Sequence, residues 1–281
     1  MTAAVASKYW QGHQGQGVAL VVIAGLLWLP EIGKRRARLW WFAYVGSIFA
    51  YTLLRSLADE TAIPTRTGYV IDIDRFVFGT SPVVWLQSAF FDPAHISFLD
   101  FFTVQVHWSF FIAPHAAAVL IFFRRRDLFP RYAFVILGTM YVGLALFFLL
   151  PTTPPWLAAQ AGALPDAFRV MDFVGNRVSP GTYQEFYASL GEPNSVAAMP
   201  SIHMGVTFGM YLWSRAHAPR IAWPLLAYSV LMGFSLVYLA EHYVADLVVG
   251  IACASLCQLG ARLIPLRVAA DEELPSRPGS P

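Results

Sequence analysis

The sequence predicts an all-α, polytopic membrane protein. Of its 281 residues, 57% are hydrophobic and 13% are charged, whereas soluble domains carry about 25% charged residues. The apolar residues gather in seven stretches with the length and composition of membrane helices. Six of these stretches lie within residues 39–264. We therefore expect a six-helix membrane core preceded by an additional N-terminal transmembrane helix.

The first apolar stretch is the shortest. Val18–Pro30 is apolar throughout, and it reaches spanning length only when extended to Gly15–Ile32. Because no small-residue cleavage site follows, we expect a retained helix rather than a cleaved signal peptide. Residues 1–38 are thus predicted to hold a short transmembrane helix and a basic cytoplasmic turn.

The remaining stretches define the predicted membrane domain, residues 39–264. They are 39–58, 99–123, 132–150, 200–214, 221–240 and 243–264. Two long connections, 59–98 and 151–199, are typical of lids or binding loops. The first contains an amphipathic patch, Val83–Leu86, that we expect at the membrane interface. The proline-rich segment 265–281 is predicted to be a disordered cytoplasmic tail.

Basic residues predict the orientation. One set of alternate connections and helix ends holds 13 of the 19 lysines and arginines, and the positive-inside rule makes that set cytoplasmic. These residues are Lys34, Arg35, Arg36, Arg38, Arg124, Arg125, Arg126, Arg131, Arg215, Arg220, Arg262, Arg267 and Arg277. The two long connections then face outward, which we expect to be the non-cytoplasmic side of the plasma membrane. The small net charge of +2 gives no indication of nucleic-acid binding.

Two motifs contain the residues best suited to chemistry. His203, in Met199–His203, and His242, in Glu241–Asp246, are 39 residues apart. At 1.5 Å per residue, that many helical residues span ~58 Å, about two crossings of a ~30 Å hydrocarbon core. The apolar, basic, apolar pattern between the motifs predicts a helical hairpin. Such a hairpin returns His242 to the membrane face that holds His203.

The first motif resembles a helix start. Pro200 suits the first helical turn, and the N–H groups of Ser201–His203 are then unpaired and directed outward. Such a terminus attracts phosphate through free donors and the helix dipole. The alternative is that Ser201 only caps the helix and that His203 lies at the membrane interface.

The second motif predicts a histidine–carboxylate pair. His242 and Asp246 are four residues apart and share one face of a helix. The carboxylate can fix the imidazole tautomer and leave the other ring nitrogen free as a nucleophile. Asp246 also begins an apolar stretch, where a carboxylate without a partner is costly. This favours a paired aspartate over a solvated one.

With these motifs the chain resembles the type 2 phosphatidic acid phosphatase superfamily, membrane lipid phosphatases and phosphotransferases with six core helices. The family motif Pro-Ser-x-His is matched by Pro200, Ser201 and His203. Its His-x-x-x-Asp motif is matched by His242 and Asp246. The resemblance implies that His242 attacks phosphorus and that Asp246 orients it. It further implies that His203 protonates the leaving oxygen, that Ser201 helps to hold the phosphoryl oxygens, and that no metal or cofactor is needed.

The family's cationic motifs are not matched. No Lys and Arg-Pro pattern precedes 132–150, and Ser235 is followed by Leu236 where the family has Ser-Arg. The inositol phosphorylceramide synthase branch, which has His-Tyr-x-x-Asp without the full cationic motifs, is more similar. This resemblance implies transfer of a phospho-headgroup, such as phosphoinositol, from a lipid donor to a lipid or polyol acceptor.

Positive charge must still stabilise the phosphate. Arg55, near the outer end of predicted helix 39–58, is the first candidate, and contact with lipid headgroups is its alternative role. Arg177, in the second long connection, is another candidate. His107, in predicted helix 99–123, either lines the pocket or is a hydrogen-bonded core residue.

Three alternative functions remain open at this stage. A lipid phosphatase would use the same centre with water as the acceptor. The shape of the pocket decides whether water or an organic acceptor reacts. A non-enzymatic lipid-binding or transport protein would not require His203, His242 and Asp246 on one face. A membrane serine protease built on Ser201 lacks a Gly-x-Ser-Gly motif. The sequence does not indicate the oligomeric state.

Overall fold

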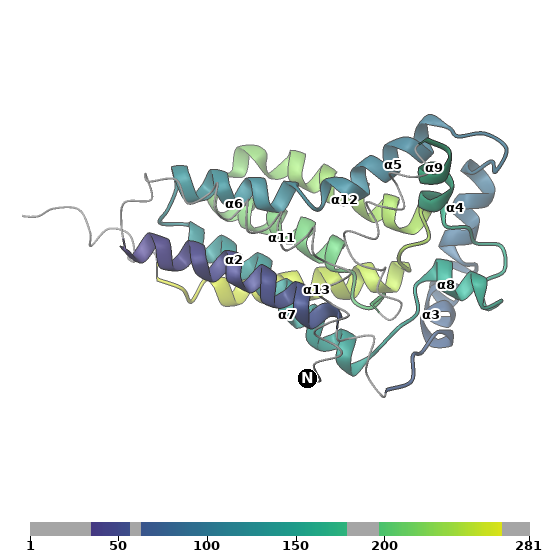
Figure 1. The fold of residues 1–281 in the computed structure, drawn as a ribbon, viewed down its shortest axis with the longest axis horizontal. Coiled ribbons are helices and arrows are strands. Elements are labelled where there is room, and N and C mark those ends of the chain that lie inside the picture. The colour runs from purple at the N-terminus through teal and green to yellow at the C-terminus, as the bar shows by residue number, and fades with distance from the viewer. Residues whose placement is uncertain (1–34, 57–62, 179–196, 266–281) are drawn as a thin grey trace, which may run out of the picture.

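A computed structural model describes residues 35–56, 63–178 and 197–265 (Figure 1). Within these ranges the chain is helical and has no named strand, although isolated β-bridges join Thr152 to Arg66 and to Ala197. This confirms the predicted all-α class. The expected N-terminal helix 15–32 lies outside the described residues, as does the expected tail except Pro265.

Seven of the described helices form a bundle, and Figure 1 shows its elongated shape. They are α2 (Arg35–Ser56), α5 (Phe98–Ser109), α6 (Ala113–Arg124), α7 (Phe129–Leu149), α11 (Ile202–His217), α12 (Ala222–Tyr238) and α13 (Val244–Ala261). A short 3-10 turn, η2 (Pro219–Ile221), precedes α12. Three segments of the described chain are long and apolar enough to cross a membrane, namely α7, η2 with α12, and α13. The protein is therefore an integral membrane protein.

Helix α2 begins earlier than the stretch 39–58 predicts. It starts at Arg35, so part of the expected basic turn is the first turn of the helix. Arginine and alanine are good helix formers, and the basic residues extend the apolar helix without a break. The described part of α2 ends at Ser56.

The predicted single helix 99–123 is wrong, because the chain forms two helices there. Helices α5 and α6 are bent by 43° across Phe110–Ile112. Pro114 stands in the first turn of α6. It has no N–H to donate, and its ring clashes with the carbonyl four residues earlier, at Phe110. The pair still passes as one bent membrane span.

Close glycine contacts hold α11 against α13. A Cβ on Gly250 would lie 2.3 Å from the carbonyl oxygen of Ser201, and a Cβ on Gly205 would lie 2.9 Å from the Gly250 carbonyl. Small residues allow membrane helices to approach this closely. The Ser201 N–H also donates to the Asp246 carbonyl at 3.0 Å. The two motif-bearing helices are thus fixed in one register.

In their described residues, the two long connections contain four short helices, which we call the helical cap. The cap consists of α3 (Gly68–Phe78), α4 (Pro82–Phe90), α8 (Pro155–Gln160) and α9 (Val170–Val178). It lies at one end of the bundle (Figure 1). Buried Gln87 joins the cap to the bundle: its amide donates to the carbonyls of Phe168 (2.9 Å) and Tyr238 (2.7 Å).

The opposite end of the bundle is basic. There α6 leads into α7, and α11 leads into η2 and α12 (Figure 1). The Arg131 guanidinium donates to the Ile264 carbonyl at 2.9 Å, so the end of α13 lies there too. The described basic residues at this end are Arg124, Arg125, Arg126, Arg131, Arg215, Arg220 and Arg262. The cap and the basic end are therefore separated by the length of the bundle.

Candidate active site

Helix α11 begins at Ile202, two residues later than Pro200, where the sequence predicts it. Ser201 is the N-cap: its buried hydroxyl accepts from the Met204 N–H at 3.3 Å. The Ser201 N–H donates to the Asp246 carbonyl, so the expectation that this N–H is unpaired is wrong. A contact between the Ser201 hydroxyl and phosphate stays a prediction.

His203 lies in the first turn of α11 and faces the second motif. Its ring centroid is 5.8 Å from that of His242, with the ring planes at 60°. The two imidazole rings are therefore close enough to contact one bound group. The His203 Nε2 atom is buried and has no hydrogen-bond partner in the structure. The hairpin thus brings the two motifs together, as their spacing predicts.

His242 follows the sharp turn that ends α12. The Glu241 N–H donates to the Leu236 carbonyl (3.0 Å) and the Ala240 N–H to the Val237 carbonyl (3.1 Å), the pattern of a Schellman motif. Ala240 has a φ of 62°, a left-handed conformation in which glycine is usual. The His242 N–H also donates to Leu236, at 3.2 Å. This turn fixes the backbone of His242.

Asp246 binds His242 from the first turn of α13. Its Oδ2 lies 3.4 Å from His242 Nδ1 and accepts from the Tyr243 N–H at 2.8 Å. Helix α13 begins at Val244, so His242 precedes the helix and does not share a helical face with Asp246 as expected. The pair forms because a carboxylate in the first turn reaches back to the residues before the helix. Asp246 is fully buried.

Asp74 is a residue of the site that the sequence reasoning missed. It lies in α3, is 1% exposed, and accepts from the N–H groups of Val244 and Ala245, each at 3.0 Å. Burial raises the pKa of Asp74, while these two donors lower it. Its carboxylate caps the helix that carries Asp246. The separation of 170 residues from Val244 left no signal except an acidic residue in an apolar setting.

His107 lies beside the two motif histidines. It is 4% exposed, and its ring centroid is 4.7 Å from that of His203. Its Nδ1 atom has no hydrogen-bond partner in the structure. Whether His107 lines the pocket stays a prediction.

Arg55 lies near the end of α2, within electrostatic range of His203. Its side chain is half-buried. The predicted position near the centre is therefore consistent with the structure. Whether Arg55 holds phosphate stays a prediction.

Arg177 makes its contacts elsewhere. Its guanidinium donates to the carbonyls of Pro93 and Ala94, each at 3.0 Å, and lies 4.2 Å from the ring centroid of Phe173. These contacts hold α9 on the connection between α4 and α5. The structure does not bring Arg177 to the histidines.

An ion pair next to His242 was not singled out from the sequence. The Arg169 Nε donates to Glu241 at 2.9 Å, and the guanidinium lies 4.3 Å from the ring centroid of Trp156. Both charged side chains are largely buried, with 10% and 14% exposure. Because Glu241 directly precedes His242, this pair ties the second motif to the cap. Its charges almost cancel, so it adds little net field at the centre.

The histidines, the aspartate and the apolar helices beneath them define the class of the protein. A histidine held by a carboxylate, with a second histidine opposite, suits phosphoester chemistry at a membrane surface. In the described part of the chain, no cluster of three or more histidine, cysteine, aspartate or glutamate side chains could hold a metal ion.

Comparison with known proteins agrees with this class. The chain belongs to the PAP2 superfamily, whose family model matches residues 69–259. It is 24% identical over 229 residues to the phosphoinositol dihydroceramide synthase of Bacteroides thetaiotaomicron, an alignment that covers 76% of this chain and 72% of the relative. No solved structure matches significantly. The protein is a lipid phosphotransferase or phosphatase, which confirms the resemblance.

Proposed function

We propose that this enzyme transfers a phospho-headgroup, such as phosphoinositol, from a lipid donor to a lipid or polyol acceptor. The transfer passes through a phosphohistidine on His242, at the outer membrane face. One observation carries the proposal. The His203 and His242 ring centroids are 5.8 Å apart at the end of a membrane bundle. The Asp246 carboxylate contacts Nδ1 of His242, which leaves Nε2 as the attacking nitrogen.

In the first half-reaction, His242 Nε2 attacks the phosphorus of the donor. A P–N bond forms and the P–O bond to the diacylglycerol breaks, while His203 gives a proton to the leaving oxygen. Asp246 keeps the Nδ1 proton of His242 in place and stabilises the positive ring. In the second half-reaction the acceptor hydroxyl attacks, His203 takes its proton, and the P–N bond breaks.

The phosphate needs positive charge, because electrostatic stabilisation dominates phosphoryl transfer. Arg55 is the proposed source, and His107 and the Ser201 hydroxyl are the proposed polar contacts. Support comes from the electrostatic interaction of Arg55 with His203 and from the ring contact between His107 and His203. Arg177 is not part of this proposal.

Transfer to a second lipid is favoured over hydrolysis by the burial of the centre. His242 is 5% exposed and Asp246 is fully buried, so bulk water has limited access to the pair. The printed name of the bacterial relative, a synthase, agrees with an organic acceptor. Hydrolysis by the same centre is the alternative outcome of the experiment.

The test follows a radioactive phosphate from donor to product. Purified enzyme in detergent is mixed with phosphate-labelled phosphatidylinositol, with and without a ceramide, and quenched rapidly at alkaline pH. We expect acid-labile label on the wild-type protein and label in a new phospholipid when ceramide is present. Free phosphate or inositol phosphate as the main product would instead indicate hydrolysis.

The His242→Ala variant separates the histidine mechanism from other mechanisms. We expect no labelled protein and no turnover, because no covalent intermediate can form. His95→Ala, at an exposed position on the cap side, is the matched control and should behave as wild type. Substantial activity of His242→Ala, or label on Ser201, would overturn the phosphohistidine.

A further inference from the structure

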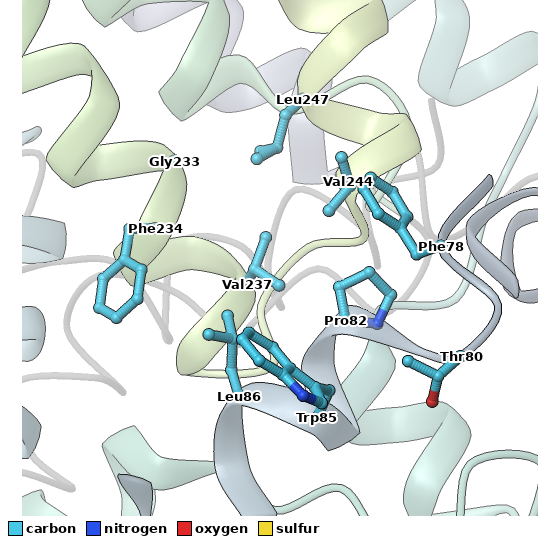
Figure 2. A pocket seen from close by; sticks show the side chains of 10 residues that line it. All are labelled: Phe78, Thr80, Pro82, Trp85, Leu86, Gly233, Phe234, Val237, Val244 and Leu247. Atoms are coloured by element: carbon cyan, nitrogen blue, oxygen red, sulfur yellow. The ribbon is translucent and has the colours of Figure 1, made fainter. Parts of the chain in front are cut away.

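An apolar groove lies between the cap and the membrane bundle. It has a volume of about 440 Å³ and is open on one side. Figure 2 shows Pro82 from the cap, Val237 from α12 and Val244 from α13 around one common space. The other lining residues are Phe78, Thr80, Trp85, Leu86, Gly233, Phe234 and Leu247. The Thr80 hydroxyl and the Trp85 indole N–H are the only polar side-chain groups among them, so the groove suits a hydrocarbon ligand rather than a sugar.

The groove is continuous with the surface that contacts lipid. Two of its walls, α12 and α13, are apolar enough to span the membrane. Further along these helices, Val230 and Val248 are 60% and 59% exposed, as expected of side chains that face acyl chains. A hydrocarbon chain can therefore enter from the bilayer without passing through water.

The rim of the groove also matches a membrane boundary. Trp85 and Phe78 are 57% and 51% exposed, on the cap side of the groove. Tryptophan is enriched at the level of the lipid headgroups. The cap would thus rest on the interface, with the groove opening beneath it.

The inner end of the groove lies close to the proposed reaction centre. Gly233, in its wall, faces α11: a Cβ there would lie 3.4 Å from the Sδ of Met204, the residue after His203. Val244, in another wall, follows His242 by two residues. Two walls of the groove therefore belong to, or pack against, the segments that carry His203 and His242.

We propose that this groove binds one acyl chain of the donor lipid. The inference rests on the proposed function, in which the donor is always a lipid whereas the acceptor is a lipid or a polyol. Chain binding in the groove sets the phosphate between the two histidines and makes the enzyme selective for donors with long chains. Each methylene group removed from an apolar site is worth about fourfold in affinity.

Photolabelling tests the occupant directly. The full-length enzyme in lipid nanodiscs is irradiated with a phosphatidylinositol that carries a diazirine in one acyl chain. We expect label in residues 78–86 and 233–247, suppressed by excess unlabelled phosphatidylinositol. Label spread along α12 and α13 and unaffected by competitor would indicate surrounding lipid only and would overturn the proposal. A diazirine ceramide that labels the groove when the phosphatidylinositol does not would overturn the donor assignment.

A blocking variant tests the functional consequence. Thr80 is exposed, so Thr80→Trp fills the groove without disturbing the core. The ratio of kcat/KM for dipalmitoyl to dibutanoyl phosphatidylinositol should fall about 15-fold if two methylene groups are displaced. Val230→Trp is the control, because valine has nearly the same shape as threonine and Val230 lies on the exposed face of α12. This variant should leave that ratio unchanged.

Two results keep this inference apart from the proposed function. If Thr80→Trp lowers kcat/KM equally for the two donors, or for neither donor, the groove does not bind the donor chain. In that case, loss of dibutanoyl turnover in His242→Ala would still support the phosphohistidine. If His242→Ala remains active on the short-chain donor, the proposed function fails, whatever the groove binds.

Discussion

Two buried carboxylates, Asp74 and Asp246, meet at the N-terminus of α13 and use its free amides. The Asp74 carboxylate accepts hydrogen bonds from the N–H groups of Val244 and Ala245, and the Asp246 carboxylate accepts one from the N–H of Tyr243. A helix N-terminus with its amides satisfied in this way offers few donors to a phosphate. At the scale of single residues, the N-terminus of α13 therefore adds little positive field for the phosphate.

Replacing Asp74 tests whether this cap positions the centre. Asp74→Ala leaves two buried amides without an acceptor, which should cost ~1–3 kcal/mol of stability. We expect a lower melting temperature and reduced kcat, because the segment that carries His242 and Asp246 loses its support. Asp72→Ala changes an exposed residue of the same helix and should alter neither quantity. Equal effects of the two variants would contradict the positioning role.

The division of labour between the histidines predicts a leaving-group effect. His203→Ala should lower kcat ~10²–10⁴-fold with a phospholipid donor, the usual worth of a positioned general acid. With an aryl phosphodiester the loss should be much smaller, since an acidic leaving group needs no proton. Steady-state rates with both substrates measure the difference, and His95→Ala serves as the surface control. A uniform loss would speak against proton donation by His203.

The sequence predicts the pairing of His242 with Asp246, but through a different geometry. Four-residue spacing indicates one helical face, whereas the structure forms the pair across the start of α13. A shift of two residues decides whether His242 belongs to the helix, and local sequence does not place a helix boundary that closely. Asp74 could not be assigned at all, because its partners are distant in the chain and are backbone groups.

At the scale of helices, apolar stretches locate the membrane bundle and miss the cap. The helices α3 and α4 have 11 and 9 residues, too short for a clear periodic signal within a mixed connection. The bend between α5 and α6 was visible as Pro114 inside an apolar stretch. Hydropathy alone does not register it, because proline interrupts the hydrogen bonds of a helix without changing its polarity.

The contact between α11 and α13 predicts a strong effect of one methyl group. Gly250→Ala puts a Cβ where the Ser201 carbonyl oxygen is 2.3 Å away, so the helices must separate. We expect ~1–3 kcal/mol of destabilisation, typical of overpacking, and a large loss of kcat. Gly46→Ala in α2, which has nothing within 4 Å, is the matched control. Thermal unfolding and steady-state rates measure both effects, and wild-type behaviour of Gly250→Ala would refute the close contact.

At the scale of the whole molecule, charge and chemistry lie at opposite ends. The basic end predicts the cytoplasmic side, so the cap and the histidines should face outward. Asp166→Cys, in the cap, should react with an impermeant maleimide added to intact cells, and Arg124→Cys should not; both positions are exposed. The native Cys253 and Cys257 are buried and give little background. The reverse labelling pattern would move the site to the inner face.

The fixed register of α11 and α13 has a kinetic consequence. Since the glycine contact and the Ser201–Asp246 hydrogen bond leave the helices no room to slide, His203 must serve both half-reactions from one position. The same residues should then also catalyse the reverse of the first half-reaction. Labelled diacylglycerol should be incorporated into phosphatidylinositol in the absence of any acceptor, an isotope exchange that requires a ping-pong mechanism. Absence of this exchange in an active preparation would mean that donor and acceptor react only when both are bound.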